Sequence, residues 1–140
     1  MNLCNYFHNL SLLSIVSMDT TGWNEFELRI PVRADVQTLY EAWSTSQGIE
    51  KWFLRSARFT TQEGRTRKIK EPVKKGDHYE WLWHGYTDDV LESNDILEAN
   101  GTDFIQFEFT GKCIVSVNLT PEGNATMVTL RQERIPEDNN

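Results

Sequence analysis

Alternating apolar and polar residues mark several segments of the chain as half-buried β-strands. The first is 25–30, where Phe26, Leu28 and Ile30 alternate with charged residues. Pro31 is predicted to end this strand, because proline has no amide hydrogen to donate to a neighbouring strand. Further alternation or strand-forming composition predicts strands at 55–61, 79–84, 96–99, 105–109, 113–120 and 125–134.

Between the first and second of these strands the apolar residues follow helical spacing instead. In 35–43 they recur on one face of a helix, at Val36, Leu39, Tyr40 and Trp43. A second short helix is predicted to start near Ser46, a favourable N-cap residue, with Ile49, Trp52 and Phe53 on one face. The order is one strand, two helices and five or six antiparallel strands, which indicates an α+β domain. Two such short helices cannot cover the apolar face of six strands, so the sheet is expected to need a further cover.

This ordered set of segments resembles the START-like (SRPBCC, birch-pollen-allergen-like) superfamily. The likeness is strongest to its AHSA branch, which is named for activators of the ATPase of a heat-shock chaperone. The similar segments are Ile30–Val32, Leu39–Thr45, Gly48–Phe53, Gly76–Tyr79, Asp95–Phe109 and Val128–Leu130. The similarity as a whole covers about 23–136.

The resemblance implies a helix-grip fold, in which a curved antiparallel sheet grips a long C-terminal helix and a cavity lies between them. We expect residues 1–18 to be an N-terminal extension and 19–140 to be a single START-like domain. The sequence ends at Asn140, shortly after Pro136, where that helix would begin. The long C-terminal helix is therefore expected to be absent, either because the chain is a fragment or because another molecule covers the sheet.

Aromatic residues are abundant, with 5 Trp, 7 Phe and 4 Tyr, and two interpretations of them remain open. One-sided strands place aromatic rings in the core without any ligand. Ligand sites are also mostly apolar, and the family resemblance implies a cavity. The candidate pocket residues are Trp43, Phe53, Tyr79, Trp81, Trp83, Phe107 and Phe109.

Charge is distributed unevenly along the chain. Lys and Arg are concentrated in 55–75, whereas 76–111 contains acidic residues but no Lys or Arg. The two segments could attract each other across the sheet, or the basic one could dock an acidic protein partner. The candidate partner contacts are Arg65, Arg67, Lys68, Lys70, Lys74 and Lys75.

Few residues suggest catalysis. His78 and His84 are the histidines inside the predicted fold, and neither comes with a partner that the sequence identifies. No cluster of His, Cys or carboxylates has zinc-ligand spacing, and the usual nucleotide-binding and hydrolase motifs are missing. We therefore predict no catalytic residue, no metal and no cofactor. Whether the protein is an enzyme stays open, and the sequence favours a protein without catalytic activity.

The overall composition narrows the possible partners. A net charge of -7 disfavours binding to nucleic acid and to anionic membranes, and no apolar run is long enough to span a bilayer. Cys4 and Cys113 fit free thiols in a reducing compartment, so a cytoplasmic protein, monomeric or homodimeric, is expected. The leading hypothesis is non-catalytic binding of a hydrophobic, lipid-like or aromatic small molecule. The alternatives are a chaperone-activator type of interaction module and a cyclase-like enzyme.

Overall fold

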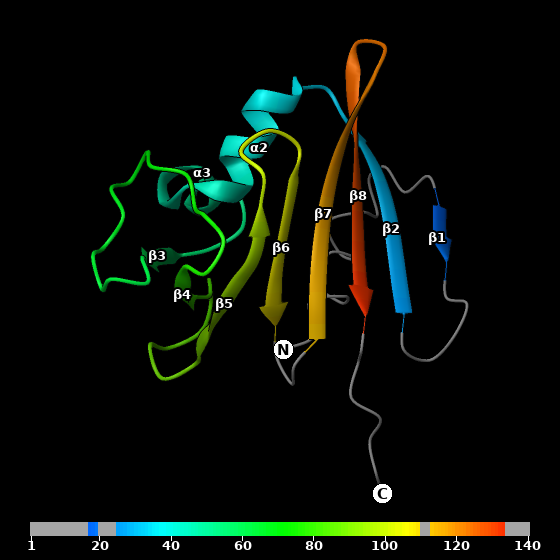
Figure 1. Cartoon of the computed structure of the whole chain (residues 1–140). Helices are drawn as coiled ribbons and strands as arrows, with labels where there is room; N and C mark the ends of the chain where they lie inside the picture. The colour runs from blue at the N-terminus through cyan, green and yellow to red at the C-terminus, as the bar shows by residue number, and fades with distance from the viewer. Residues whose placement is uncertain (1–16, 20–24, 110–112, 134–140) are drawn as a thin grey trace, which may run out of the picture.

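The computed structural model describes residues 17–19, 25–109 and 113–133. One antiparallel sheet of eight strands dominates it, in the spatial order β1-β2-β8-β7-β6-β5-β4-β3 (Figure 1). The strands are β1 (Ser17–Asp19), β2 (Glu25–Val32), β3 (Ser56–Thr60), β4 (His78–Leu82), β5 (Leu91–Ala99), β6 (Phe104–Phe109), β7 (Cys113–Glu122) and β8 (Ala125–Glu133). The predicted α+β helix-grip class, with two short helices after the first long strand, is confirmed.

Helices α2 (Val36–Ser44) and α3 (Ser46–Glu50) form a tight corner on one face of the sheet (Figure 1). Asp35 caps α2, because its Oδ1 accepts a hydrogen bond of 2.7 Å from the backbone N–H of Thr38. Thr45 serves both helices. Its hydroxyl donates to the Glu41 carbonyl at 2.9 Å, and the same oxygen accepts from the Gly48 N–H at 2.9 Å. One residue thus ends α2 and starts α3.

The corner depends on the lack of a side chain at Gly48. A Cβ placed there would lie 2.1 Å from the Glu41 carbonyl oxygen and 2.8 Å from the Thr45 hydroxyl. Since the nearest atom belongs to the backbone, it cannot rotate away. We expect Gly48→Ala to lower the free energy of unfolding by about 1–3 kcal/mol, the usual cost of overpacking. Urea denaturation measures this change, and Gly64→Ala, which meets no atom within 4 Å but strains a turn with φ of 90°, separates steric from backbone effects.

Several boundaries differ from the sequence predictions by one or more residues, and two of the differences have a clear physical reason. Pro31 does not end β2, which continues to Val32 with Pro31 opposite Met127 of β8. The described part of β1 pairs with β2 only as far as Arg29. Past Arg29, the side of β2 that faces β1 has no described neighbour, and such a strand edge tolerates a residue without N–H. Strand β5 begins at Leu91 rather than 96. Its first half was missed because Glu92 and Asn94 place polar groups where alternation requires apolar ones.

The segment between β3 and β4 folds back onto the sheet and the helix corner. The Arg67 N–H donates to the Phe59 carbonyl of β3, and the Thr61 N–H donates to the Arg65 carbonyl, both at 2.8 Å. Further along, the Val73 N–H donates to the carbonyl of Ser44 at 2.8 Å. This segment, 61–77, is therefore a fixed part of the domain.

Two predictions fall partly or wholly outside the described residues. The expected N-terminal extension lies there except for Ser17 and Met18, which belong to β1 and pair with β2. The position of the C-terminal helix expected from the family resemblance, after Pro136, also lies outside.

Candidate functional site

The seven aromatic residues predicted to line a pocket are all buried, and each is at most 6% exposed. Most of them contact one another. Trp81 stacks on Tyr79 with ring centroids 3.9 Å apart and meets Phe107 edge-on at 5.1 Å. Trp83 contacts Phe53 and Phe109 in the same edge-on way. These rings belong to one hydrophobic core, which supports the core interpretation for most of the set.

Of the seven, Trp43 also lines a cavity. This apolar cavity, of about 230 Å³, lies where α2 meets β2 and β8. Its walls in the described chain are entirely apolar: Ile30, Val32, Leu39, Ala42, Trp43, Trp52, Val128 and Leu130. Several of them are only partly buried, so apolar side chains remain accessible from solvent.

Trp52 is held firmly although it follows the short helix α3. Its Nε1–H donates to the Ala42 carbonyl of α2 at 2.9 Å. The indole meets Trp43 edge-on, with centroids 4.7 Å apart, and stacks on Phe53 at 5.0 Å. Apolar spacing predicts that Trp52 lies on a helix face, but Trp52 is not among the seven predicted pocket residues. In the sequence, the only sign that Trp52 lines a hollow is its position as a large aromatic residue beside the polar Lys51, just after a short helix.

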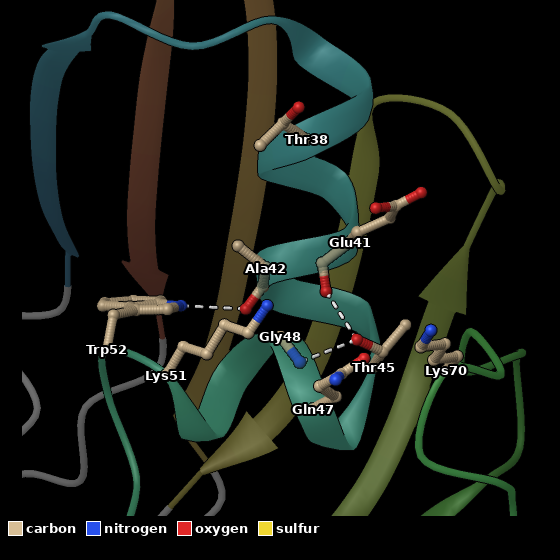
Figure 2. A pocket seen from close by; sticks show the side chains of 9 residues that line it. All are labelled: Thr38, Glu41, Ala42, Thr45, Gln47, Gly48, Lys51, Trp52 and Lys70. Carbon is tan, nitrogen blue, oxygen red and sulfur yellow. Dashed lines mark hydrogen bonds between the residues drawn. The ribbon is translucent and has the colours of Figure 1, made fainter.

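A second hollow, the polar groove, lies on the solvent side of the helix corner (Figure 2). Its volume is about 440 Å³, and it is lined by Thr38, Glu41, Ala42, Thr45, Gln47, Gly48, Lys51, Trp52 and Lys70. Ala42 and Trp52 therefore line both hollows. Figure 2 shows the Lys51 side chain extending back toward Ala42 beside Trp52, whereas the Glu41 carboxylate lies on the other side of α2.

The basic segment contains a buried ion-pair cluster. The Arg67 guanidinium binds the Asp77 carboxylate with two hydrogen bonds and also contacts Glu71. Both side chains of the first pair are buried, with 7% of Arg67 and 3% of Asp77 exposed. The hydrogen bond to Asp77 raises the pKa of Arg67. Hydrogen bonds, first from Arg65, then from the Lys68 backbone and Arg67, lower the pKa of Glu71 to about 2.

This cluster changes the set of candidate partner contacts. Arg67 is 8% exposed and its guanidinium is paired within the domain with Asp77 and Glu71. This burial argues against Arg67 as a partner contact, although it also lines the charged hollow described next. Arg65 pairs with Glu71 and Lys75 pairs with Glu98, at 2.7 and 2.9 Å. Both remain accessible, and with Lys74 they border a charged hollow of about 530 Å³. Lys68, Lys70 and Lys74 are exposed and form no ion pair within the described residues.

Attraction between the basic and acidic segments is also visible. Arg67 with Asp77, Lys75 with Glu98 and Arg55 with Asp88 each join 55–75 to the acidic segment. The uneven charge distribution thus serves, at least in these three pairs, to connect strands and loops within the domain.

The two histidines among the described residues, His78 and His84, line none of the three hollows. His78 is part of a hydrogen-bonded chain in which Nδ1 contacts Asp95 at 2.9 Å and Nε2 contacts the Ser93 hydroxyl at 2.7 Å. This order of groups is the one that activates a serine nucleophile. However, the chain is exposed on the sheet face opposite to the core, and none of its members lines a hollow described above. His84 is exposed in the turn after β4.

Inside the core, Tyr79 also has a satisfied hydroxyl. Burial raises the pKa of Tyr79, and its hydroxyl donates to the backbone carbonyl of Glu108. A phenol held this way serves packing rather than proton transfer. Among the described residues no group of three or more His, Cys, Asp or Glu could hold a metal ion, and no helix is long and apolar enough to cross a membrane.

The comparisons with known proteins agree with this architecture. Residues 33–140 match the family model "Activator of Hsp90 ATPase homolog 1-like protein". The chain therefore belongs to this family, as the sequence resemblance indicated. No curated protein matches it.

Solved structures share the fold at low sequence identity. The crystal structure of SSP2350 from Staphylococcus saprophyticus has a TM-score of 0.63 at 15% identity, covering 82% of this chain and 74% of that one. A protein from Rhodobacter sphaeroides has a TM-score of 0.61 at 17% identity, covering 85% and 77%. The solution structure of the Aha1 dimer from Colwellia psychrerythraea has a TM-score of 0.58 at 16% identity, covering 82% and 79%. At these identities the likeness shows the fold alone.

Proposed function

We propose that the protein binds a small hydrophobic molecule, without catalysis, in the apolar cavity between α2, β2 and β8. The observation that carries this proposal is the composition of the described walls, in which eight residues are apolar and none is polar. An accessible apolar hollow is costly to leave in water, and a bound apolar molecule removes that cost.

The size of the cavity limits the ligand. A cavity of about 150 Å³ is known to take up benzene, so about 230 Å³ suits a one- or two-ring aromatic molecule or a short alkyl chain. Trp81 is packed against Tyr79 and Phe107 and does not line this cavity. We therefore place the ligand at the edge of the core, against Trp43 and Trp52, rather than in its centre.

Filling the cavity provides the test. Ile30 is partly exposed on β2 and lies opposite Val128 of β8, so Ile30→Trp inserts an indole into the cavity. If the indole displaces two methylene groups of a ligand, at about 0.8 kcal/mol each, affinity should fall roughly tenfold. Isothermal titration calorimetry with 1-octanol as the probe measures this change.

The matched control is Ile114→Trp. Ile114 is also partly buried, but it lies on β7, outside the cavity walls. Its substitution should leave 1-octanol affinity unchanged. Equal affinity in both variants would show that the alcohol binds elsewhere, and no binding to the unaltered protein would remove the proposal.

Docking of a protein partner remains the second candidate. It is favoured by the exposed Lys68, Lys70 and Lys74, which form no ion pair among the described residues. Such a docking surface would make association sensitive to salt, since exposed charges more than about 10 Å apart are screened at 0.1 M ionic strength. Arg67 contributes little to this surface, because it is 8% exposed and paired with Asp77 and Glu71. A cyclase-like activity has no comparable support, because the described cavity walls contain no acid or base.

A further inference from the structure

We infer that the natural ligand is an anionic amphiphile, with its apolar part in the apolar cavity and a carboxylate head in the polar groove at Lys51. This inference rests on the proposed function and adds the chemical class of the ligand. It begins from the contact between the two hollows, which share the walls Ala42 and Trp52. The inference requires that a molecule longer than the cavity passes around Trp52 to reach the groove.

The partition between the hollows is fixed in place. The hydrogen bond from Trp52 Nε1 to the Ala42 carbonyl spans the helix corner at 2.9 Å, and the ring is packed on Trp43 and Phe53. Trp52 therefore lines both hollows from a fixed position. An amphiphile has the matching shape, because its polar end and its apolar end must occupy adjacent but different environments.

The charge next to this partition is positive. Lys51 is adjacent to Trp52 in the sequence, is exposed, and has no ion pair within the part of the chain that the structure describes. Figure 2 shows its side chain directed along α2 toward Ala42, on the Trp52 side. Lys70 lies at the opposite wall of the groove. Among the described residues that line the groove, the only carboxylate is Glu41, which lies on the far side of α2 from Lys51 (Figure 2).

The charge of the groove is opposite in sign to the net charge of the protein. The chain has a net charge of -7, which repels anions at long range, yet the groove presents two lysines and one carboxylate. A lysine ammonium binds a carboxylate as a flexible point charge. Thr38 and Gln47 in the same groove offer hydroxyl and amide groups to a bound head. The groove thus favours an anionic head over a neutral or cationic one.

The test compares two probes of equal chain length, octanoate and 1-octanol, by isothermal titration calorimetry. A purely apolar site prefers the neutral alcohol, because it need not desolvate a charge. At low ionic strength we expect octanoate to bind the unaltered protein roughly two- to fivefold more tightly than 1-octanol, the range of a partly exposed ion pair. Added salt should reduce this preference.

Two lysine variants test whether Lys51 causes the preference for octanoate over 1-octanol. Lys51→Gln should abolish it by lowering octanoate affinity more than 1-octanol affinity, whereas Lys68→Gln, an exposed lysine outside the groove, should leave both affinities unchanged. The Trp52 indole N–H signal, assigned by its loss in Trp52→Phe, should shift in NMR spectra when either probe binds. Octanoate binding should also fall in Ile30→Trp.

The possible failures can be told apart. If both probes bind and neither Lys51→Gln nor salt alters their ratio, the cavity is a ligand site but the anionic head is overturned. If octanoate still binds Ile30→Trp at full affinity, the anion binds outside the cavity and the inference is also overturned. If neither probe binds the unaltered protein, the proposed function and the inference of an anionic ligand both fail.

Discussion

Replacing Arg67 with Met is expected to lower the free energy of unfolding by about 3–5 kcal/mol, because it leaves the buried Asp77 carboxylate without its partner. Methionine nearly matches the arginine stem in length, so the lost charge rather than lost volume dominates. Asp77 keeps one hydrogen bond of 2.9 Å from the Lys74 N–H, which does not neutralise it. Urea denaturation at neutral pH, followed by circular dichroism, measures the effect.

Arg65→Met is the matched control for this prediction. Arg65 pairs with Glu71 at 2.7 Å, but more than half of its side chain is exposed, and pairs of this kind contribute about 0–1 kcal/mol. Adding Asp77→Asn to Arg67→Met should recover part of the lost stability, since no buried charge then remains. Equal losses for Arg65→Met and Arg67→Met would contradict the buried ion pair.

Trp81→Ala is expected to have a comparable effect, about 3–5 kcal/mol, from the loss of a buried aromatic side chain. Trp81 is 1% exposed and contacts the rings of Phe53, Tyr79 and Phe107. Its removal would open a cavity that these surrounding rings cannot fill. Thermal denaturation and urea denaturation should agree on the size of the loss.

Tyr86→Ala gives the comparison for Trp81→Ala. Tyr86 is an aromatic residue that is 50% exposed, so its replacement should change stability by no more than about 0.5 kcal/mol. If Trp81→Ala instead kept full stability and lost only binding of 1-octanol, Trp81 would be a pocket residue after all. That result would return the ligand to the centre of the aromatic cluster.

The order of elements could be predicted from the sequence because alternation and helical spacing are local patterns. The strand 105–109 and the helix stripe through Tyr40 were identified this way. Alternation also shows which side chains point to the core face of the sheet. It does not show which part of that face the helices cover, and for this reason Trp43 could not be separated from Trp81 as a cavity residue.

The role of Arg67 was not predictable for a related reason. In the sequence it is one cation in a basic run, and its burial depends on the fold bringing Asp77 against it. Trp52 likewise acquires its position from a hydrogen bond to Ala42, ten residues earlier. Residues whose roles depend on such tertiary contacts give little signal in a single sequence.

The fold-back of 61–67 onto β3 also bears on how the protein behaves in a concentrated solution. β3 is the last strand of the sheet, and a terminal strand with unpaired backbone groups is a template for pairing with another molecule. The N–H of Arg67 occupies the Phe59 carbonyl at that boundary, while its guanidinium anchors the segment to Asp77. Arg67 thus stabilises the interior through its side chain, and through its backbone it helps to shield the β3 edge from pairing with another molecule.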